Sequence, residues 1–300
     1  MEKGLIFALL AAVGFAVGTV YVRKASSQTG ESFTGAAITV FAGIPFFAVA
    51  VFFSGEWSKL WSLSGRAFVL LAAAGIIHFV IGRLLAYNSF RLIGANKGSA
   101  FLATIPFYAV ILGVLFLNEP ITIYLISGVL CIAAGGALVS TERKSVSEQT
   151  QKGGSRVELK GILTALGAAF CWGITPVLIK PAVEEIGSPL VGAFVSYIAA
   201  TIVIAFFLFR QQHRQQIFQL RSFVGLIPLL ISGVFVSTGQ LFNYSALGHS
   251  PASVVSPLVC TNILFVFLLS FLINRNIEVF TLKVISGMVA MVIGTFLIFY

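Results

Sequence analysis

The sequence contains no aspartate, and its ten glutamates all lie in polar stretches or at the ends of apolar runs. No carboxylate therefore lies near the middle of an apolar run. Proton-coupled exporters of organic cations ordinarily use a carboxylate embedded at mid-depth in the membrane. Its absence argues against that class of transporter, and the lack of aspartate also removes the paired aspartates of membrane-embedded hydrolases.

Cysteine is scarce as well, because the chain has only Cys131, Cys171 and Cys260, all inside apolar runs. Their spacing matches neither a metal site nor a disulfide framework. The other metal-ligand candidates, His213 and His249, lie in or beside polar stretches far from His78 in the sequence. The sequence therefore predicts no metal site, no cofactor and no catalytic residue.

Charged residues make up 10% of the chain and hydrophobic residues 58%, with a mean hydropathy of +1.01. A soluble domain is about one quarter charged and must present much of its surface to water. We therefore expect a membrane protein with the lipid bilayer as its partner. The net charge of +9 belongs to the loops of such a protein, so no nucleic-acid partner is expected.

Ten apolar stretches are long enough to cross the hydrocarbon core as helices, which needs about 20 residues each. The first is interpreted as a span and not as a removed signal peptide. The predicted spans are 4–22, 33–53, 67–88, 95–117, 121–140, 160–180, 188–209, 223–246, 251–273 and 280–300.

The chain repeats itself across a polar linker at 141–159. A shift of 157 residues places Gly82, Leu84 and Tyr87 on Gly239, Leu241 and Tyr244, and similar matches occur along both halves. The sequence therefore predicts a five-helix repeat at 1–140 and a second at 160–300. Because five is odd, the second repeat enters the membrane from the opposite side. We expect an all-α membrane protein with ten transmembrane helices in two inverted five-helix repeats, an arrangement that suits alternating access.

Basic residues favour one orientation of this arrangement. Thirteen lie on the side of the linker and four on the side of the termini, which favours a cytoplasmic linker and external termini. The four are Lys3, Lys59, Arg66 and Lys180.

Several motifs resemble the EamA branch of the drug/metabolite transporter superfamily. They are CWGITPVLIK at 171–180, YNSFR at 87–91, NEPIT at 118–122, YSAL at 244–247 and PAS at 251–253. The resemblance implies a five-plus-five inverted repeat, export or exchange of metabolites such as amino acids, and cytoplasmic termini. The first helix departs from the pattern, since Phe15 and Ala16 stand where the family has tryptophan and glycine.

Polar side chains inside the predicted spans are the candidates for substrate binding. A charged side chain at the centre of a span costs about 2.5–3.5 kcal/mol, so such residues face the interior of the bundle. His78 lies at the centre of the third span, and Arg83 follows about 8 Å along the helix. The candidates are His78, Arg83, Tyr87, Trp172, Gln240, Asn243, Tyr244 and Asn262.

Arg83 is expected to hold a carboxylate or a phosphate, or alternatively to snorkel to the interface or bond to a carbonyl. Gln240 and Tyr244 match Arg83 and Tyr87 in the repeat, which predicts a site where the repeats meet, although polar side chains also join helices structurally. Pro106, Pro176 and Pro257 are candidate helix breaks for gating, because proline frees a backbone carbonyl.

The leading hypothesis is a transporter that exports or exchanges a small zwitterionic or anionic metabolite, in the cytoplasmic membrane of a prokaryote. Coupling is either absent or runs through His78, because imidazole titrates near neutral pH. The alternatives are an exporter of drugs or organic cations, an intramembrane enzyme and a non-transporting membrane protein.

Overall fold

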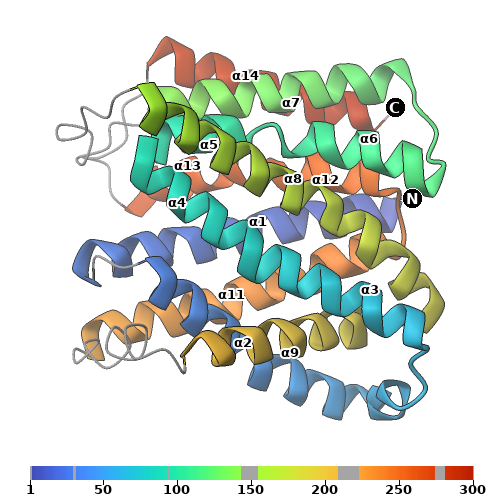
Figure 1. The fold of residues 1–300 in the computed structure, drawn as a ribbon. Helices are drawn as coiled ribbons and strands as arrows, with labels where there is room; N and C mark the ends of the chain where they lie inside the picture. Colours follow the sequence, from blue (N-terminus) through green and yellow to red (C-terminus); the bar gives the residue numbers. More distant parts are fainter. Residues whose placement is uncertain are drawn as a thin grey trace. The chain divides into compact units, whose positions relative to one another are not determined.

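A computed structural model describes the backbone of residues 2–29, 32–93, 95–142, 155–208, 223–273 and 281–299. Side chains are described over 2–21, 37–93, 98–139, 156–207, 226–269 and 281–299. The described residues are almost entirely helical and contain no strand (Figure 1). Most of the linker expected at 141–159 lies outside the described residues, at positions 143–154.

Eight helical segments of the described chain are long and apolar enough to cross a membrane, and two shorter apolar helices complete ten. The first half contains α1 (Glu2–Thr29), α2 (Ser32–Ser54), η1 (Glu56–Leu60), α3 (Gly65–Gly75), η2 (Ile76–Gly82), α4 (Arg83–Ile93), α5 (Ala95–Leu102), α6 (Ile105–Leu117) and α7 (Ile123–Glu142). The second half contains α8 (Ser155–Ile186), α9 (Pro189–Leu208), α11 (Phe223–Leu247), α12 (Ala252–Cys260), α13 (Asn262–Ile273) and α14 (Leu282–Ile298).

The predicted fold class is confirmed: the chain is an all-α membrane protein of ten transmembrane helices in two inverted five-helix repeats. Three details differ from the expected spans. The third span runs on to Ile93 and contains the wider helical turn η2, the sixth begins at Ser155, and the fourth and ninth are each broken into two helices. Breaks of this kind leave no trace in hydropathy, because the residues on both sides remain apolar.

The helices divide into two compact units, and each unit draws on both repeats. The first unit comprises residues 1–80 and 178–249, and the second comprises 81–177 and 250–300. In the first unit, α11 packs along α1 and α2, and α9 packs against α2 and α3. In the second unit, α7 lies beside α14 (Figure 1) and α6 packs against α12.

Glycines bring paired helices into close contact. A Cβ atom on Gly14 of α1 would stand 2.9 Å from the Cα atom of Gly239 on α11. A Cβ atom on Gly287 of α14 would stand 2.8 Å from the carbonyl oxygen of Gly135 on α7. Because these distances leave no room for a side chain, the backbones pack directly and gain dispersion contacts, the attraction that remains between helices in lipid.

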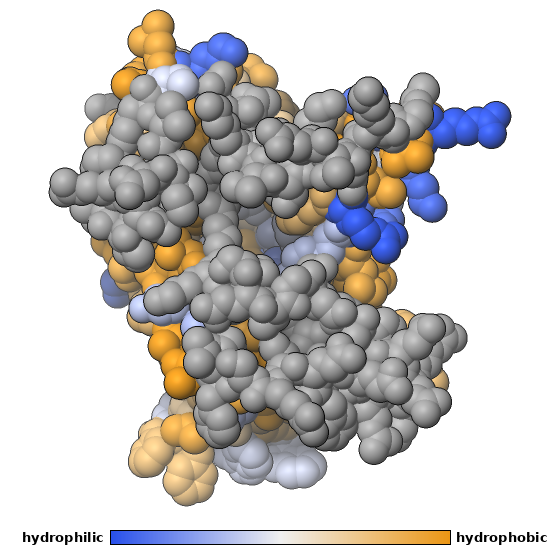
Figure 2. Space-filling model, turned by 90° about the vertical axis from the view of Figure 1, so that its left-hand side faces the viewer, coloured by the Kyte–Doolittle hydropathy of each residue, from blue (hydrophilic) through white to orange (hydrophobic). Residues whose placement is uncertain are grey.

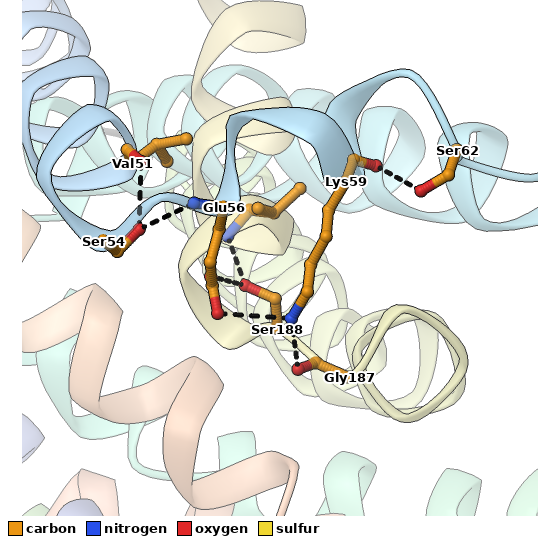
Figure 3. Close-up of polar contacts among 8 residues, drawn as sticks. Val51, Ser54, Glu56, Lys59, Ser62, Gly187 and Ser188 are labelled. Carbon is orange, nitrogen blue, oxygen red and sulfur yellow. Dashed lines mark hydrogen bonds and ion pairs between the residues drawn. The ribbon is translucent and has the colours of Figure 1, made fainter.

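Polar loop residues of the two repeats bond to one another inside the first unit (Figure 3). Lys59 Nζ lies 3.2 Å from Glu56 Oε1 and donates to the carbonyl of Gly187 at 3.1 Å. Ser188 donates to Glu56 Oε2, and its hydroxyl accepts from the Val191 N–H at 3.1 Å. Ser188 therefore caps α9 while it joins the loop after α2 to the loop before α9.

Large hydrophobic side chains remain on the outside of the helices, where hydrophobic residues reach the surface in Figure 2. Phe53 is 81% exposed, Phe206 73% and Phe116 67%. Water would make such exposure costly, whereas lipid solvates these side chains without penalty. The exposed apolar surface follows from the bilayer being the solvent.

Candidate functional site

His78 lies within η2, in the middle of the helical segment from Gly65 to Ile93. The backbone of η2 is wound more widely than an α-helix, and turns of this kind occur often at functional sites. Gly75 stands just before η2, and a Cβ atom there would meet the backbone of Ser196 on α9. The close approach of these backbones places η2 against α9 and brings His78 into the interior of the first unit.

Three of the predicted residues meet in this interior. The Nε2 atom of Gln240 lies 3.0 Å from the Nε2 atom of His78, and Asn243 Nδ2 donates to Gln240 Oε1 at 3.5 Å. Gln240 is 2% exposed and Asn243 8% exposed. Gln240 and Asn243 are three residues apart on α11, so they share one face of that helix. The three side chains form a polar chain in which Gln240 and Asn243 are buried and His78 is half-buried, and we call it the His78–Gln240–Asn243 chain.

Tyr244, a fourth predicted residue, lies in the same unit but is 1% exposed. Its hydroxyl bonds to the Ser196 side chain, which itself donates to the Leu71 carbonyl at 2.8 Å. Next to it, Tyr197 packs on Phe79, with ring centroids 4.5 Å apart. Tyr244 thus ties α11 to α9, and its hydroxyl is bound within the protein.

The other predicted binding residues belong to the second unit. Arg83 and Tyr87 are half-buried on α4, and Asn262 is half-buried at the start of α13. Trp172 packs against a core cluster that contains Ala86 and Ala169. Arg83 follows directly on η2, so it continues the helical segment that holds His78.

The fourth and ninth spans break at positions that correspond in the repeat. α5 ends at Leu102 and α6 begins at Ile105, while α12 ends at Cys260 and α13 begins at Asn262. Thr104 Oγ1 donates to the Phe101 carbonyl at 2.7 Å, and Thr261 Oγ1 donates to the Leu258 carbonyl at 2.6 Å. Both pairs are related by the shift of 157 residues. In each break, the carbonyl accepts from both the backbone N–H and the hydroxyl of the threonine.

The three prolines occupy different positions relative to these breaks. Pro106 is in the first turn of α6, where its missing N–H is tolerated, and it is buried. Pro257 lies inside α12, four residues before Thr261, and Pro176 is buried within α8. The structure therefore places two of the three prolines beside a break.

Glu119 is a functional candidate that the sequence reasoning did not single out. Its carboxylate is 7% exposed and accepts hydrogen bonds from the backbone N–H groups of Ala252 at 2.6 Å and Ser253 at 2.8 Å. Asn118, with φ of 50°, turns the chain so that Glu119 points back to the start of α12. The internal repeat could have indicated Glu119 from the sequence, because Glu119 matches Glu278 in the second half.

Among the side chains that the structure describes, no group of histidines, cysteines and glutamates is placed to hold a metal ion. The arrangement offers amide, imidazole and hydroxyl groups inside an apolar bundle. Such groups bind a polar solute through hydrogen bonds.

Comparison with known proteins places this architecture in a family. The model of the EamA-like transporter family matches residues 2–141 and 159–300, which is nearly the whole chain in two copies. A protein of Bacillus subtilis (strain 168), named as the uncharacterized transporter YvbV, is 30% identical over 143 residues. That match covers 47% of this chain and 46% of the relative, less than half of either protein.

A solved crystal structure has the same fold. It matches 99% of this chain and 96% of its own, with a TM-score of 0.73 and 13% sequence identity. At an identity this low, the match supports the arrangement of the helices and says nothing about the substrate. The family match covers both five-helix repeats, and the chain therefore belongs to the EamA-like transporter family.

Proposed function

We propose that the protein exports or exchanges a small polar metabolite, amino-acid-like and either zwitterionic or anionic, across the cell membrane by alternating access. The observation that carries the proposal is the pair of breaks at Thr104 and Thr261. Discontinuous helices at corresponding positions of two inverted repeats are typical of transporters that exchange the open side by moving their halves.

The polar chain supports the substrate class. His78, Gln240 and Asn243 supply hydrogen-bonding groups, and no carboxylate lies among them. Arg83, the first residue of α4, carries a guanidinium group, which suits a carboxylate or a phosphate. An organic cation would find no counter-ion in this set.

Binding is tested by a thermal-shift screen of purified protein against amino acids, nucleosides, sugar phosphates and organic cations. A solute that binds only the folded state raises the stability by RT ln(1 + [L]/Kd). We expect a shift with an amino acid or an organic anion, lost in Gln240→Leu and weakened in Arg83→Ala. The matched control is Thr238→Val on the same helix, because Thr238 is half-buried and its hydroxyl donates to the carbonyl of Val234 within that helix.

Transport is tested by counterflow in proteoliposomes with the solute that gives the shift. Thr104→Val and Thr261→Val remove equivalent hydrogen bonds. We expect each variant to slow counterflow several-fold and to retain the thermal shift. The reason is that the helix breaks allow the helices to move during transport and do not bind the solute. Full counterflow in both variants would contradict the role of the breaks.

A thermal shift with organic cations alone would contradict the substrate class and favour a drug exporter.

A further inference from the structure

The helices α6 and α12 pack against each other within the second unit, and their two ends differ. At one end, α6 starts and α12 ends at the two helix breaks described above. These breaks lie close together, because a Cβ atom on Gly136 of α7 would stand 3.6 Å from Ala103 Cβ and 3.2 Å from Ile263 Cδ1. At the other end, Glu119 follows α6 and bonds to the first two residues of α12. The pair therefore has its breaks at one end and a side-chain bond at the other.

The length of α12 places the breaks and Glu119 at different depths. This helix has 9 residues, and a rise of about 1.5 Å per residue gives it a length of about 14 Å. That is about half of the hydrocarbon core, which is about 30 Å thick. Glu119 stands just beyond the predicted span at 95–117, so it lies near one membrane interface and the breaks lie near the middle. A turn of α12 about its break therefore moves the end at Glu119 the most.

The backbone of α6 and of the turn after it holds the Glu119 carboxylate against α12. Asn118 adopts the left-handed conformation, with φ of 50°, and turns the chain after α6. A Cβ atom on Gly113 would stand 2.7 Å from Glu119 Oε2, so the glycine leaves room for the carboxylate. The Glu119 N–H donates to the Gly113 carbonyl at 3.3 Å. The carboxylate is thus placed in advance for the two N–H groups at the start of α12.

The packed position of α12 buries two hydroxyl groups at a cost. Ser253 is 1% exposed and Ser256 is 6% exposed, and neither hydroxyl oxygen has a hydrogen-bond partner in the part of the chain that the structure describes. The two serines are three residues apart, so they share one face of α12. Burial of a hydroxyl group without a partner is unfavourable, whereas hydrogen bonds to a carboxylate are favourable. The packed position of α12 therefore depends on the bonds of Glu119, and movement of α12 would give both hydroxyls access to water or to a polar solute.

We propose that α6 and α12 form a gate at this end of the second unit, and that Glu119 is the positioning residue that keeps the gate closed. Opening breaks the two hydrogen bonds of the carboxylate and turns α12 about the break at Thr261, so that its start leaves the end of α6. The inference rests on the proposed alternating access for its role, and it adds the residue that holds one of the two states. No covalent bond changes.

Opening is tested by the rate at which Ser253→Cys reacts with N-ethylmaleimide, in nanodiscs, in protein whose three native cysteines are replaced by alanine. Ser253 suits the reporter because its backbone N–H bonds to Glu119, whereas its hydroxyl has no partner among the described residues. Glu119→Gln is expected to raise the rate about tenfold or more, the factor that corresponds to the loss of one hydrogen bond to a charged group. Glu2→Gln, at an exposed position of α1, is expected to leave the rate unchanged. An unchanged rate in Glu119→Gln would overturn the proposal.

A second reporter separates opening of the gate from a general loosening of the unit. Ser89→Cys places the thiol on α4, at a position that is 0% exposed in the same unit. In Glu119→Gln, the reporter at Ser89 is expected to keep the rate that it has with Glu119 intact. An equal rise at both reporters would also overturn the proposal, because it would show that the whole unit is destabilised.

Ala252→Pro weakens the same contact from the side of α12. Proline removes the N–H that donates to Glu119 Oε1, and it is tolerated at the first position of a helix. Pro251 has φ of −57° and ψ of 144°, a conformation that a following proline allows. We expect the Ser253→Cys rate to rise, and we expect Glu119→Gln to add less in this background than it does alone. Fully independent effects of the two changes would contradict a shared contact and overturn the proposal.

These rates do not depend on transport. A gate that opens in Glu119→Gln in a protein without counterflow would contradict the proposed function and leave the gate itself supported. Normal counterflow with an unchanged rate at Ser253→Cys would overturn the gate and leave the proposed function standing.

Discussion

At the scale of single residues, Glu119 joins the end of the fourth span to the start of the ninth. Its carboxylate accepts from Ala252 and Ser253, two of the N–H groups that the first turn of α12 cannot satisfy within the helix. A negative charge at a helix N-terminus is also favoured by the helix dipole. Because the side chain is 7% exposed, water does not readily replace these bonds.

Glu119→Gln is expected to lower the thermal midpoint of the purified protein. The amide keeps one acceptor oxygen but turns an NH₂ group towards a backbone N–H. Hydrogen bonds to charged groups contribute about 1.5–3 kcal/mol each, and one of the two is lost. Differential scanning fluorimetry in detergent measures the change. The control is Glu2→Gln, because Glu2 is exposed in the first turn of α1. An equal decrease of the thermal midpoint in both variants would contradict the explanation that burial strengthens the bonds of Glu119.

The sequence predicted the members of the polar chain better than their contacts. His78, Gln240 and Asn243 were candidates because polar side chains inside spans face the bundle. Their bonding could not be predicted, since His78 and Gln240 are 162 positions apart and a hydrogen bond depends on the rotation of two helices about their axes. Tyr244, also a candidate binding residue, is 1% exposed and bonded to Ser196.

At the scale of helices, hydropathy located the spans but not their interruptions. A break at Thr104 or Thr261 interrupts the helix over one or two residues and leaves the apolar pattern intact. The signal is instead the coincidence of a threonine at the same repeat position in both halves. Whether such a threonine ends a helix depends on how its hydroxyl competes for a backbone carbonyl in the folded bundle.

Gly287→Ala is expected to destabilise the pairing of α14 with α7. The new methyl group would stand 2.8 Å from the Gly135 carbonyl and 2.9 Å from a methyl group of Val139, so the helices must separate. Overpacking of this kind costs about 1–3 kcal/mol.

The matched control for Gly287→Ala is Gly65→Ala at the start of α3, where an added Cβ meets nothing within 4 Å. This variant is expected within about 0.5 kcal/mol of the wild type. The thermal midpoints of both variants check the prediction. Equal midpoints would show that the contact of α7 with α14 tolerates separation.

At the scale of the whole molecule, the repeat does not coincide with the compact units. Residues 1–80 group with 178–249, and residues 81–177 group with 250–300. Each unit therefore needs helices from both halves to bury its small-residue faces, as Gly14 does against Gly239. A single half, expressed alone, would leave those faces exposed.

The distribution of basic residues predicts that the linker is cytoplasmic and the termini are external. In a background that lacks Cys131, Cys171 and Cys260, a cysteine at Ser62 is expected to react with a membrane-impermeant maleimide in intact cells. Ser62 is exposed in the loop between η1 and α3. A cysteine at Ser147 in the linker is expected to react only after lysis. The reverse pattern would support cytoplasmic termini, as the family resemblance implies.

The sequence by itself determined the membrane class, the number of spans, the duplication and its inversion. These are properties of composition and order along the chain: lipid selects apolar runs about 20 residues long, and an odd number of spans inverts the second copy. The tertiary structure decided which side chains meet. Glu119 reaches α12 across 133 positions, and Gln240 reaches His78, because hydrogen bonds and glycine contacts depend on helix rotation and separation to within a fraction of an ångström.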